Sequence, residues 1–156
     1  MNKYSIRSVL RSDIAKLKIV LDETQLFPST MLDEMIEPFF EDAQCRAHWL
    51  TCDLDDQAVA LLYCIPEMMT EGTWNVLAIA VKPEFQSHGI GEQMMSHIEQ
   101  SLIASGEQTL IVETSSLPEY DRTRQFYQRI GYCREACIRD FYAKGEHKIV
   151  FWKSLN

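Results

Sequence analysis

The chain has 156 residues, of which 46% are hydrophobic and 24% charged, and its formal net charge is −8. This composition is typical of a globular protein with one core, so we expect a single domain over residues 1–156. No apolar run approaches the roughly 18 residues of a membrane helix, and no signal peptide is visible. The acidic balance disfavours general binding to nucleic acid. We therefore expect a cytoplasmic protein with neither a membrane nor a nucleic-acid partner.

The spacing of apolar residues alternates along the chain between the two-residue period of strands and the longer period of helices. The pattern predicts, in chain order, a strand over 3–9, helices over 12–23 and 30–42, strands over 45–52, 57–65 and 73–81, a helix over 90–104, a strand over 109–114, a helix over 121–130, and strands over 132–138 and 147–153. Ser12 is a candidate N-cap, and Pro38 predicts that the second helix kinks or restarts. The strand over 73–81 is almost entirely apolar, so we expect it to be central and buried on both faces.

This order predicts one α/β domain with a mixed sheet. The step from strand 73–81 through helix 90–104 to strand 109–114 predicts a right-handed crossover, which would make these two strands parallel neighbours. Two further sets of residues are expected in the core. They are the cysteines, Cys45, Cys52, Cys64, Cys133 and Cys137, as buried free thiols with no metal-ligand spacing, and the tryptophans, Trp49, Trp74 and Trp152.

A short polar loop, QSHGIG at residues 86–91, leads directly into the helix over 90–104. The loop holds two glycines but neither lysine nor arginine. A helix N-terminus exposes unpaired backbone N–H groups and carries about half a unit of positive charge. The loop is therefore either a phosphate site built from backbone N–H groups or an ordinary strand-to-helix turn.

The segment AVKPEFQSHGIG, followed after one more strand by TRQFYQRIGY, resembles the GCN5-related N-acetyltransferase (GNAT) family. The order of elements agrees with that family over nearly the whole chain. The two motifs are carried by Val81, Pro83, Gln86, Gly89 and Gly91, and by Phe126, Tyr127, Gly131 and Tyr132.

The resemblance implies a GNAT-like fold: a mixed, mostly antiparallel sheet with a splayed central parallel pair of strands and helices on both faces. It also implies that acetyl-CoA is a co-substrate, with its pyrophosphate on the loop backbone and its pantetheine beside the preceding strand. No metal is implied. The residues that would contact acetyl-CoA are Ile79, Ala80, Val81, Gln86, Ser87, His88, Gly89, Ile90, Gly91, Glu92 and Tyr127.

Two catalytic roles follow from the resemblance. Tyr127 matches the family tyrosine that protonates the departing CoA thiolate, although a core tyrosine is the alternative. Many members take the general base from the central strand, but residues 73–81 contain no carboxylate. Glu113 on the adjacent strand is the first candidate, ahead of Asp140 and Glu119, and a carboxylate that is merely satisfied by hydrogen bonds is the alternative.

Several positions depart from the family pattern or lack a role. Tyr120 stands where an asparagine often holds the pantetheine, and Gln86 stands where many members have arginine. His88 lies in the phosphate loop, too far from the expected amine to act as the base, and His48, His97 and His147 are expected to be structural. Residues 31–40 fall where the family builds its acceptor site, although helix packing also explains them.

The predicted activity is direct transfer of the acetyl group to a primary amine of a small molecule or a peptide. The acidic net charge favours a cationic acceptor. A non-catalytic CoA-binding sensor or interaction module of the same fold is the first alternative, and an unrelated nucleotide-binding domain is the second. The oligomeric state stays open, with a homodimer as one option.

Overall fold

The computed structural model describes residues 4–156, so Lys3, the first residue of the predicted first strand, lies outside the described residues. Every predicted helix and strand is present, in the predicted order. The strands are β1 (Tyr4–Ser8), β2 (His48–Leu54), β3 (Gln57–Pro66), β4 (Thr73–Val81), β5 (Thr109–Ser115), β6 (Cys133–Ala143) and β7 (Glu146–Ser154). The helices are α1 (Ile14–Thr24), α2 (Leu32–Glu41), α3 (Ile90–Ala104) and α4 (Asp121–Arg129), with short 3-10 helices η1 (Arg11–Asp13), η2 (Ser29–Met31), η3 (Pro83–Phe85) and η4 (Pro118–Tyr120).

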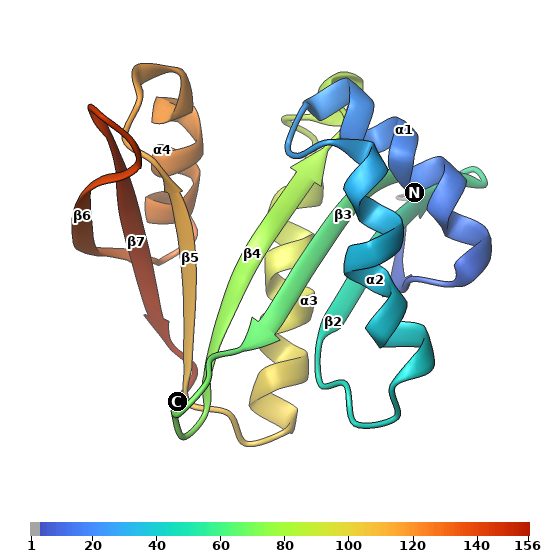
Figure 1. The fold of residues 1–156 in the computed structure, drawn as a ribbon, viewed down its shortest axis with the longest axis horizontal. Coiled ribbons are helices and arrows are strands. Elements are labelled where there is room, and N and C mark those ends of the chain that lie inside the picture. The colour runs from blue at the N-terminus through green and yellow to red at the C-terminus, as the bar shows by residue number, and fades with distance from the viewer. Residues whose placement is uncertain (1–3) are drawn as a thin grey trace. The chain divides into compact units, whose positions relative to one another are not determined.

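The strands form one open sheet in the order β1-β2-β3-β4-β5-β7-β6 (Figure 1). Residues 73–76 of β4 run parallel to residues 109–112 of β5, whereas β1–β2, β2–β3, β5–β7 and β6–β7 are antiparallel. The mixed, mostly antiparallel sheet with a central parallel pair is thereby confirmed. The splay of that pair stays a prediction. The helices within residues 4–156 are all too short or too polar to cross a bilayer.

The chain divides into two compact units, each built from separated segments. Among the described residues, the first contains 4–65 and 77–100, and the second contains 66–76 and 101–156. Three elements contribute residues to both units: β4, α3 and, through Pro66 alone, β3. The expectation of one domain over residues 1–156 stays a prediction.

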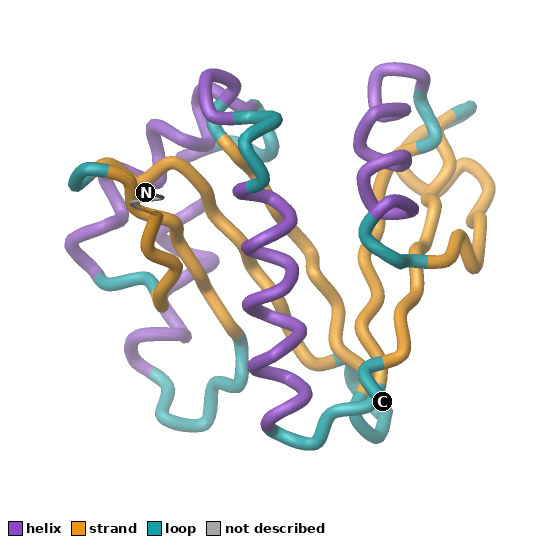
Figure 2. The backbone as a smooth tube through the Cα atoms, turned by 180° about the vertical axis from the view of Figure 1, so that it is seen from behind, coloured by secondary structure: helices purple, strands orange, loops and turns teal. Residues whose placement is uncertain are grey.

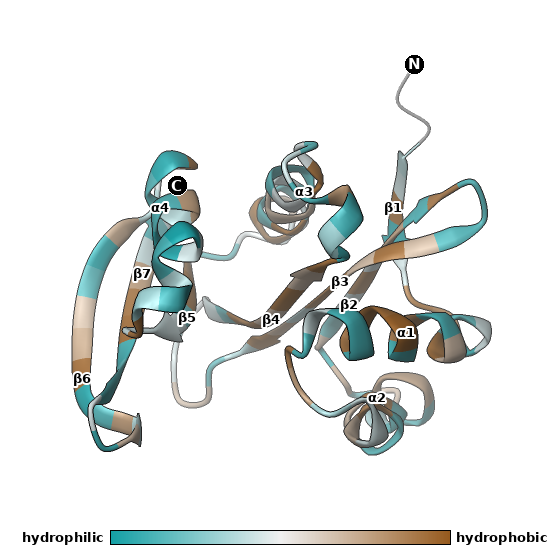
Figure 3. Cartoon of the chain, turned by 90° about the horizontal axis from the view of Figure 1, so that it is seen from above, coloured by the Kyte–Doolittle hydropathy of each residue, from teal (hydrophilic) through white to brown (hydrophobic). Residues whose placement is uncertain are grey.

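In the first unit, helices cover both faces of the strands: α1 and α2 lie on one side and α3 on the other (Figure 3). Complete burial of a large aliphatic side chain stabilises a fold by about 1.5–3 kcal/mol, so a small set of such residues is enough to hold the helices on the strands. The buried residues that hold α1 and α2 on the strands include Leu17, Val20, Leu21, Leu32, Ile36, Trp49 and Leu61.

One helix prediction in this unit is wrong, and a second is wrong in part. Ser12 is not the N-cap of α1, because the chain enters that helix through η1 and Asp13 occupies the N-cap position. The buried carboxylate of Asp13 makes no capping hydrogen bond to α1. That carboxylate accepts hydrogen bonds from the Leu10 N–H and from Arg7, both at 2.7 Å. Of the two outcomes expected at Pro38, a restart of α2 does not occur, and a kink stays a prediction. The ring of Pro38 is exposed, and the opposite side of α2 is buried, so packing outweighs the lost backbone hydrogen bond.

In the second unit, α4 covers one face of the strands β5, β7 and β6. The ring centroid of Tyr127 lies 5.5 Å from that of Phe151, and the residues buried beneath α4 also include Leu110, Val112 and Ile149. Side chains alternate between the faces of a sheet. Because Glu113 pairs with Val150 and Val112 pairs with Phe151, Glu113 projects from the face opposite α4.

Several core predictions are wrong in detail. Cys133 and Cys137 are exposed on β6, and Trp152 is 37% exposed, because β6 is an edge strand and α4 covers only one face of this unit's sheet. Leu77 is 44% exposed, so β4 is not buried on both faces along its whole length. In α4 the deepest side chain is Tyr127, whereas the predicted core residues, Phe126 and Ile130, are only half-buried.

Candidate functional site

The loop before α3 has the backbone geometry of an anion-binding turn. Two of its residues, Ser87 (φ 66°) and Gly89 (φ 82°), adopt left-handed conformations. The Gln93 N–H donates to the Gly89 carbonyl at 3.0 Å, which is the first hydrogen bond of the helix. The N–H groups of residues 89–92 therefore precede the first helical donor and have no partner within the helix. Figure 2 shows this loop in teal at one end of α3.

There is room for a ligand in front of this backbone. A Cβ atom built on Gly89 would meet nothing within 4 Å, and residues 86–89 are all exposed. Gln86 has a different part: its N–H donates to the Pro83 carbonyl at 3.3 Å and its side chain to the Val81 carbonyl at 3.0 Å. Gln86 thus shapes the loop, while the donors at its helical end stay open to an anion. These residues fit a phosphate-bearing substrate such as acetyl-CoA.

Tyr127 lies in the second unit and is only 3% exposed. Its ring meets the rings of Phe126, Tyr132 and Phe151 at centroid distances of 5.3, 6.1 and 5.5 Å. Burial raises the pKa of Tyr127 above its ordinary value near 10. The phenol is therefore fully protonated at neutral pH, which is the state that a proton donor needs.

Glu113 belongs to a polar network on the other face of the same sheet. Its Oε1 accepts hydrogen bonds from the Asn75 side chain at 3.0 Å and lies 3.2 Å from the Lys148 ammonium. The same Asn75 nitrogen donates to Glu67 Oε1 at 2.8 Å. Lys148 also lies over the ring of Phe141, 3.9 Å from its centroid. Nearby, Tyr142 has a raised pKa, first through burial and then through the charge of Glu113.

The structure does not bring Tyr127 and Glu113 into contact, because they occupy opposite faces of β5 and β7. The weaker base candidates have other partners or surroundings. Asp140 accepts from the Gly145 N–H at 2.8 Å within the turn between β6 and β7, and Glu119 is exposed in η4. His88 is exposed in the loop of the first unit.

Sequence reasoning did not find Asn75, Glu67 or Lys148. One signal was visible, since Asn75 is a polar residue inside the apolar run TWNVLAIAV. A buried amide in such a strand needs a hydrogen-bond partner, and the carboxylates that supply it come from the β3–β4 connection and from β5. Only the strand pairing reveals which residues those are.

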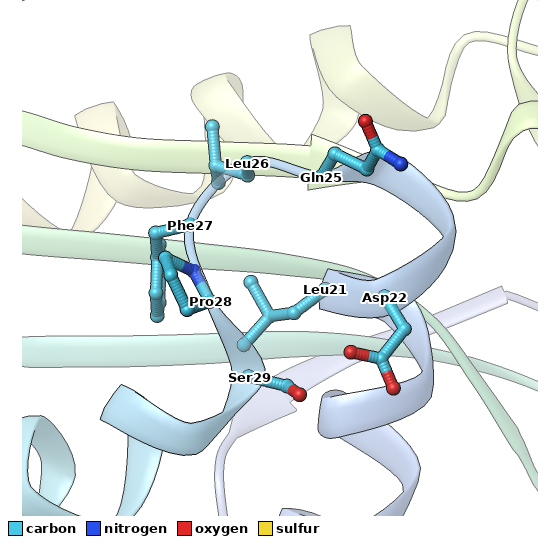
Figure 4. Close-up of a pocket in the computed structure, with 7 residues that line it drawn as sticks. All are labelled: Leu21, Asp22, Gln25, Leu26, Phe27, Pro28 and Ser29. Carbon is cyan, nitrogen blue, oxygen red and sulfur yellow. The ribbon is translucent and has the colours of Figure 1, made fainter.

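The first unit also contains a pocket between the end of α1 and the start of η2. Figure 4 shows its lining, formed by Leu21, Asp22, Gln25, Leu26, Phe27, Pro28 and Ser29. The left-handed conformation of Gln25 (φ 55°) ends α1, and the chain then turns past Pro28 into η2. The segment that lines the pocket ends at Ser29, just before residues 31–40, which are expected to form the acceptor site. Its polar side chains include the Asp22 carboxylate.

The sequence matches one protein family: residues 45–134, more than half of the chain, match the acetyltransferase (GNAT) domain. That segment includes the loop before α3, Glu113 and Tyr127. No curated protein is a significant sequence match to the chain.

Solved structures share the fold over nearly its full length. A GNAT-family protein from Desulfovibrio desulfuricans is 28% identical, with a TM-score of 0.91, over 98% of this chain and 99% of that one. The ribosomal-protein-S18-alanine N-acetyltransferase of Escherichia coli is 17% identical, with a TM-score of 0.78, over 98% and 94%. An aminoglycoside 6′-N-acetyltransferase solved with coenzyme A is 16% identical, with a TM-score of 0.78, over 97% of each chain.

Proposed function

This chain belongs to the acetyltransferase (GNAT) domain family, and from that premise we propose that it transfers the acetyl group of acetyl-CoA directly to a primary amine. The observation that carries the proposal is the loop before α3. It presents consecutive unpaired N–H groups at a helix N-terminus, beside a glycine with open space in front of it. A pyrophosphate can bind there without a cationic side chain.

In the proposed complex, the backbone of residues 86–92 holds the pyrophosphate, and the backbone of Ile79, Ala80 and Val81 lies along the pantetheine. Fixed N–H donors of this kind also stabilise negative charge on a thioester oxygen, and losing one such donor typically costs about 3–4 kcal/mol of transition-state stabilisation. The acyl donor therefore needs no metal-ligating group from the protein.

The proton transfers balance as follows. The acceptor reaches the protein as an ammonium and gives one proton to Glu113, directly or through water. The neutral amine nitrogen then forms a bond to the carbonyl carbon, the nitrogen of this adduct loses a second proton to solvent, and the carbon–sulfur bond breaks. Glu113 releases the proton that it took to solvent before the next turnover. Tyr127 gives its proton to the departing thiolate and is reprotonated from solvent. The products are the amide and free CoA thiol.

We further propose that the acceptor is cationic, either a small molecule or a peptide. The net charge of −8 favours an ammonium ligand, and the proposed base, Glu113, is a partly exposed carboxylate. Among the structural relatives, one enzyme is named for a protein alanine and another for aminoglycosides. At their low identity they share only the fold, so they leave both acceptor classes open. We propose the cytoplasm, where acetyl-CoA is available, as the location.

The test is release of CoA thiol from acetyl-CoA in the presence of putrescine, lysine amide or an alanyl peptide. We expect at least one of these amines to raise thiol release well above the rate of hydrolysis. Calorimetry with acetyl-CoA accompanies the assay. Binding of acetyl-CoA without any amine-dependent release would instead support a non-catalytic CoA-binding module of the same fold.

A further inference from the structure

We propose that Asn75 is a positioning residue that acts on the reaction through Glu113, with Glu67 as its second anchor. This inference rests on the proposed function, because Glu113 is the proposed base. It assigns a role to two residues that carry none in the proposal above. All three residues lie in the second unit of the chain.

The strand register brings the three residues together. Asn75 of β4 pairs with Ile111 of β5, and Glu113 follows two residues later on the same face. At the other side, the Glu67 N–H donates to the Thr73 carbonyl at 2.8 Å, which holds the end of β3 beside the start of β4. The Asn75 amide therefore lies between the carboxylate of Glu67, in the β3–β4 connection, and that of Glu113 on β5.

Only the nitrogen of the Asn75 side-chain amide has hydrogen-bond partners among residues 4–156. The Nδ2 of Asn75 donates to Glu67 Oε1 at 2.8 Å and to Glu113 Oε1 at 3.0 Å. Each of the two amide hydrogens therefore binds a different carboxylate. The side chain is 1% exposed, and its Oδ1 has no hydrogen-bond partner among residues 4–156. A buried acceptor without a partner destabilises a fold, and an apolar residue would avoid that cost. What the amide supplies instead is a fixed position for two carboxylates.

This arrangement leaves one oxygen of the proposed base available. The Asn75 nitrogen and the Lys148 ammonium both contact Glu113 Oε1. Within the described part of the chain, Oε2 of Glu113 has no such contact and can accept the proton of an ammonium. The Glu113 side chain is 20% exposed, so an acceptor can reach it. Asn75 thus fixes which oxygen faces the reaction.

The test is a double-mutant cycle between Asn75→Ser and Glu113→Gln, measured as thiol release with the fastest amine of the panel above. A displacement of about 1 Å in a catalytic group can lower the rate by up to about a hundredfold. We expect Asn75→Ser to lower kcat by ten- to a hundredfold with the affinity for acetyl-CoA unchanged. In the Glu113→Gln background we expect Asn75→Ser to change kcat by less than about twofold, because the group it positions is no longer a base.

Glu67 provides a second, independent variant in case Asn75→Ser disturbs the fold. Glu67→Ala removes the anchor and should lower kcat as Asn75→Ser does. Glu67→Gln keeps an acceptor oxygen and should stay within about threefold of wild type. Glu71→Ala, at an exposed carboxylate in the same β3–β4 connection, is the matched control and should leave kcat unchanged. Circular dichroism checks the fold of every variant.

Three outcomes would overturn the inference. If the effects of Asn75→Ser and Glu113→Gln multiply, Asn75 acts only on the stability or shape of the fold. If Glu67→Gln is as damaging as Glu67→Ala, the anchor is a charge and not a hydrogen-bond acceptor. If Glu113→Gln is fully active, or if the wild type acetylates no amine, the proposed function itself fails and the inference falls with it. The activity of Glu113→Gln alone and that of the wild type show this failure without the double-mutant cycle.

Discussion

The residue that most limits the proposed chemistry is Tyr127. A proton donor must keep its proton at neutral pH and must release it to the departing thiolate. An ordinary phenol, with a pKa near 10, already meets the first condition. Burial beside Phe126, Tyr132 and Phe151 raises the pKa of Tyr127 further, which makes the release of its proton harder. The same packing explains why a phenylalanine could occupy the site without loss of the fold.

The first prediction concerns that hydroxyl. Tyr127→Phe should lower kcat by about a hundredfold or more, because a positioned acid contributes roughly 10²–10⁴ to the rate. Affinity for acetyl-CoA should stay within about threefold, because the aromatic ring is retained. Thiol-release kinetics and calorimetry measure the two quantities. Phe126→Leu, on the same helix, is the control, and equal losses from both variants would show that packing alone matters.

The second prediction concerns Cys52, which is fully buried on β2. Burial, assisted by Asp53, raises the pKa of Cys52 to about 11. An unfolded thiol loses its proton near pH 8.5, so above this pH the unfolded state binds fewer protons than the folded state. Stability should therefore fall as the pH rises from about 9 to 11, by about 1.4 kcal/mol per pH unit for this group.

Urea unfolding at several pH values between 8 and 10.5 measures this dependence. Cys52→Ala is expected to be less stable than wild type at pH 8, because it leaves a small cavity, yet to lose less stability on going to pH 10.5. If the free energy of unfolding fell equally with pH in wild type and in Cys52→Ala, Cys52 would have the same pKa in the folded and the unfolded protein.

At the scale of elements, the loop and helix α3 act together. The left-handed Gly89 lies directly before α3, and the N–H groups of the first helical turn have no partner within the helix, so the loop and the helix together form the candidate anion site. Since the donors belong to the backbone, side-chain identity matters chiefly through the conformations that it allows.

The third prediction follows from that geometry. Gly89→Val should weaken acetyl-CoA binding by at least tenfold, because a β-branched residue at φ 82° is strained and would reshape the loop. Gly91→Val should also weaken binding, whereas His88→Ala should change it by less than about threefold. Calorimetry compares the variants. Equal losses from all three would mean that side chains, and not backbone N–H groups, hold the phosphate.

The fourth prediction concerns α2, which tolerates Pro38 in its interior. Because the Pro38 side chain is exposed, Pro38→Ala removes no core contact and restores one backbone donor. An interior proline costs a helix about 3 kcal/mol, part of which is offset by its restriction of the unfolded chain. We expect the variant to be more stable by about 1–2 kcal/mol in thermal or urea unfolding. A lower stability would show that the helix needs the proline's conformation.

At the scale of the whole molecule, three elements contribute residues to both units, β3 through its last residue only. Strand β4 and helix α3 each run from one unit into the other, so neither unit can unfold completely without disturbing an element of its neighbour. This continuity supports the expectation of a single domain over residues 1–156, which the fifth prediction tests.

We expect one cooperative unfolding transition. Trp49 lies in the first unit, whereas Trp74 and Trp152 lie in the second. The variant Trp49→Phe keeps only the tryptophans of the second unit, and the double variant Trp74→Phe/Trp152→Phe keeps only that of the first, so their fluorescence would report the units separately. Circular dichroism would report the helices. Coincident midpoints would indicate two-state behaviour, and two separated transitions would instead define two domains.

The sequence by itself determined the order of the elements, the family and the loop before α3. These features depend on local periodicity, on glycines with special conformations and on short motifs, all of which are written in neighbouring residues. The tertiary structure decided which face of each element is covered. It placed Cys133 and Trp152 at the surface, and it put Asp13 instead of Ser12 at the N-cap position of α1. It also assembled Asn75 with Glu67 and Glu113, because a hydrogen bond between side chains 8 and 38 residues apart exists only when the segments that carry them lie side by side.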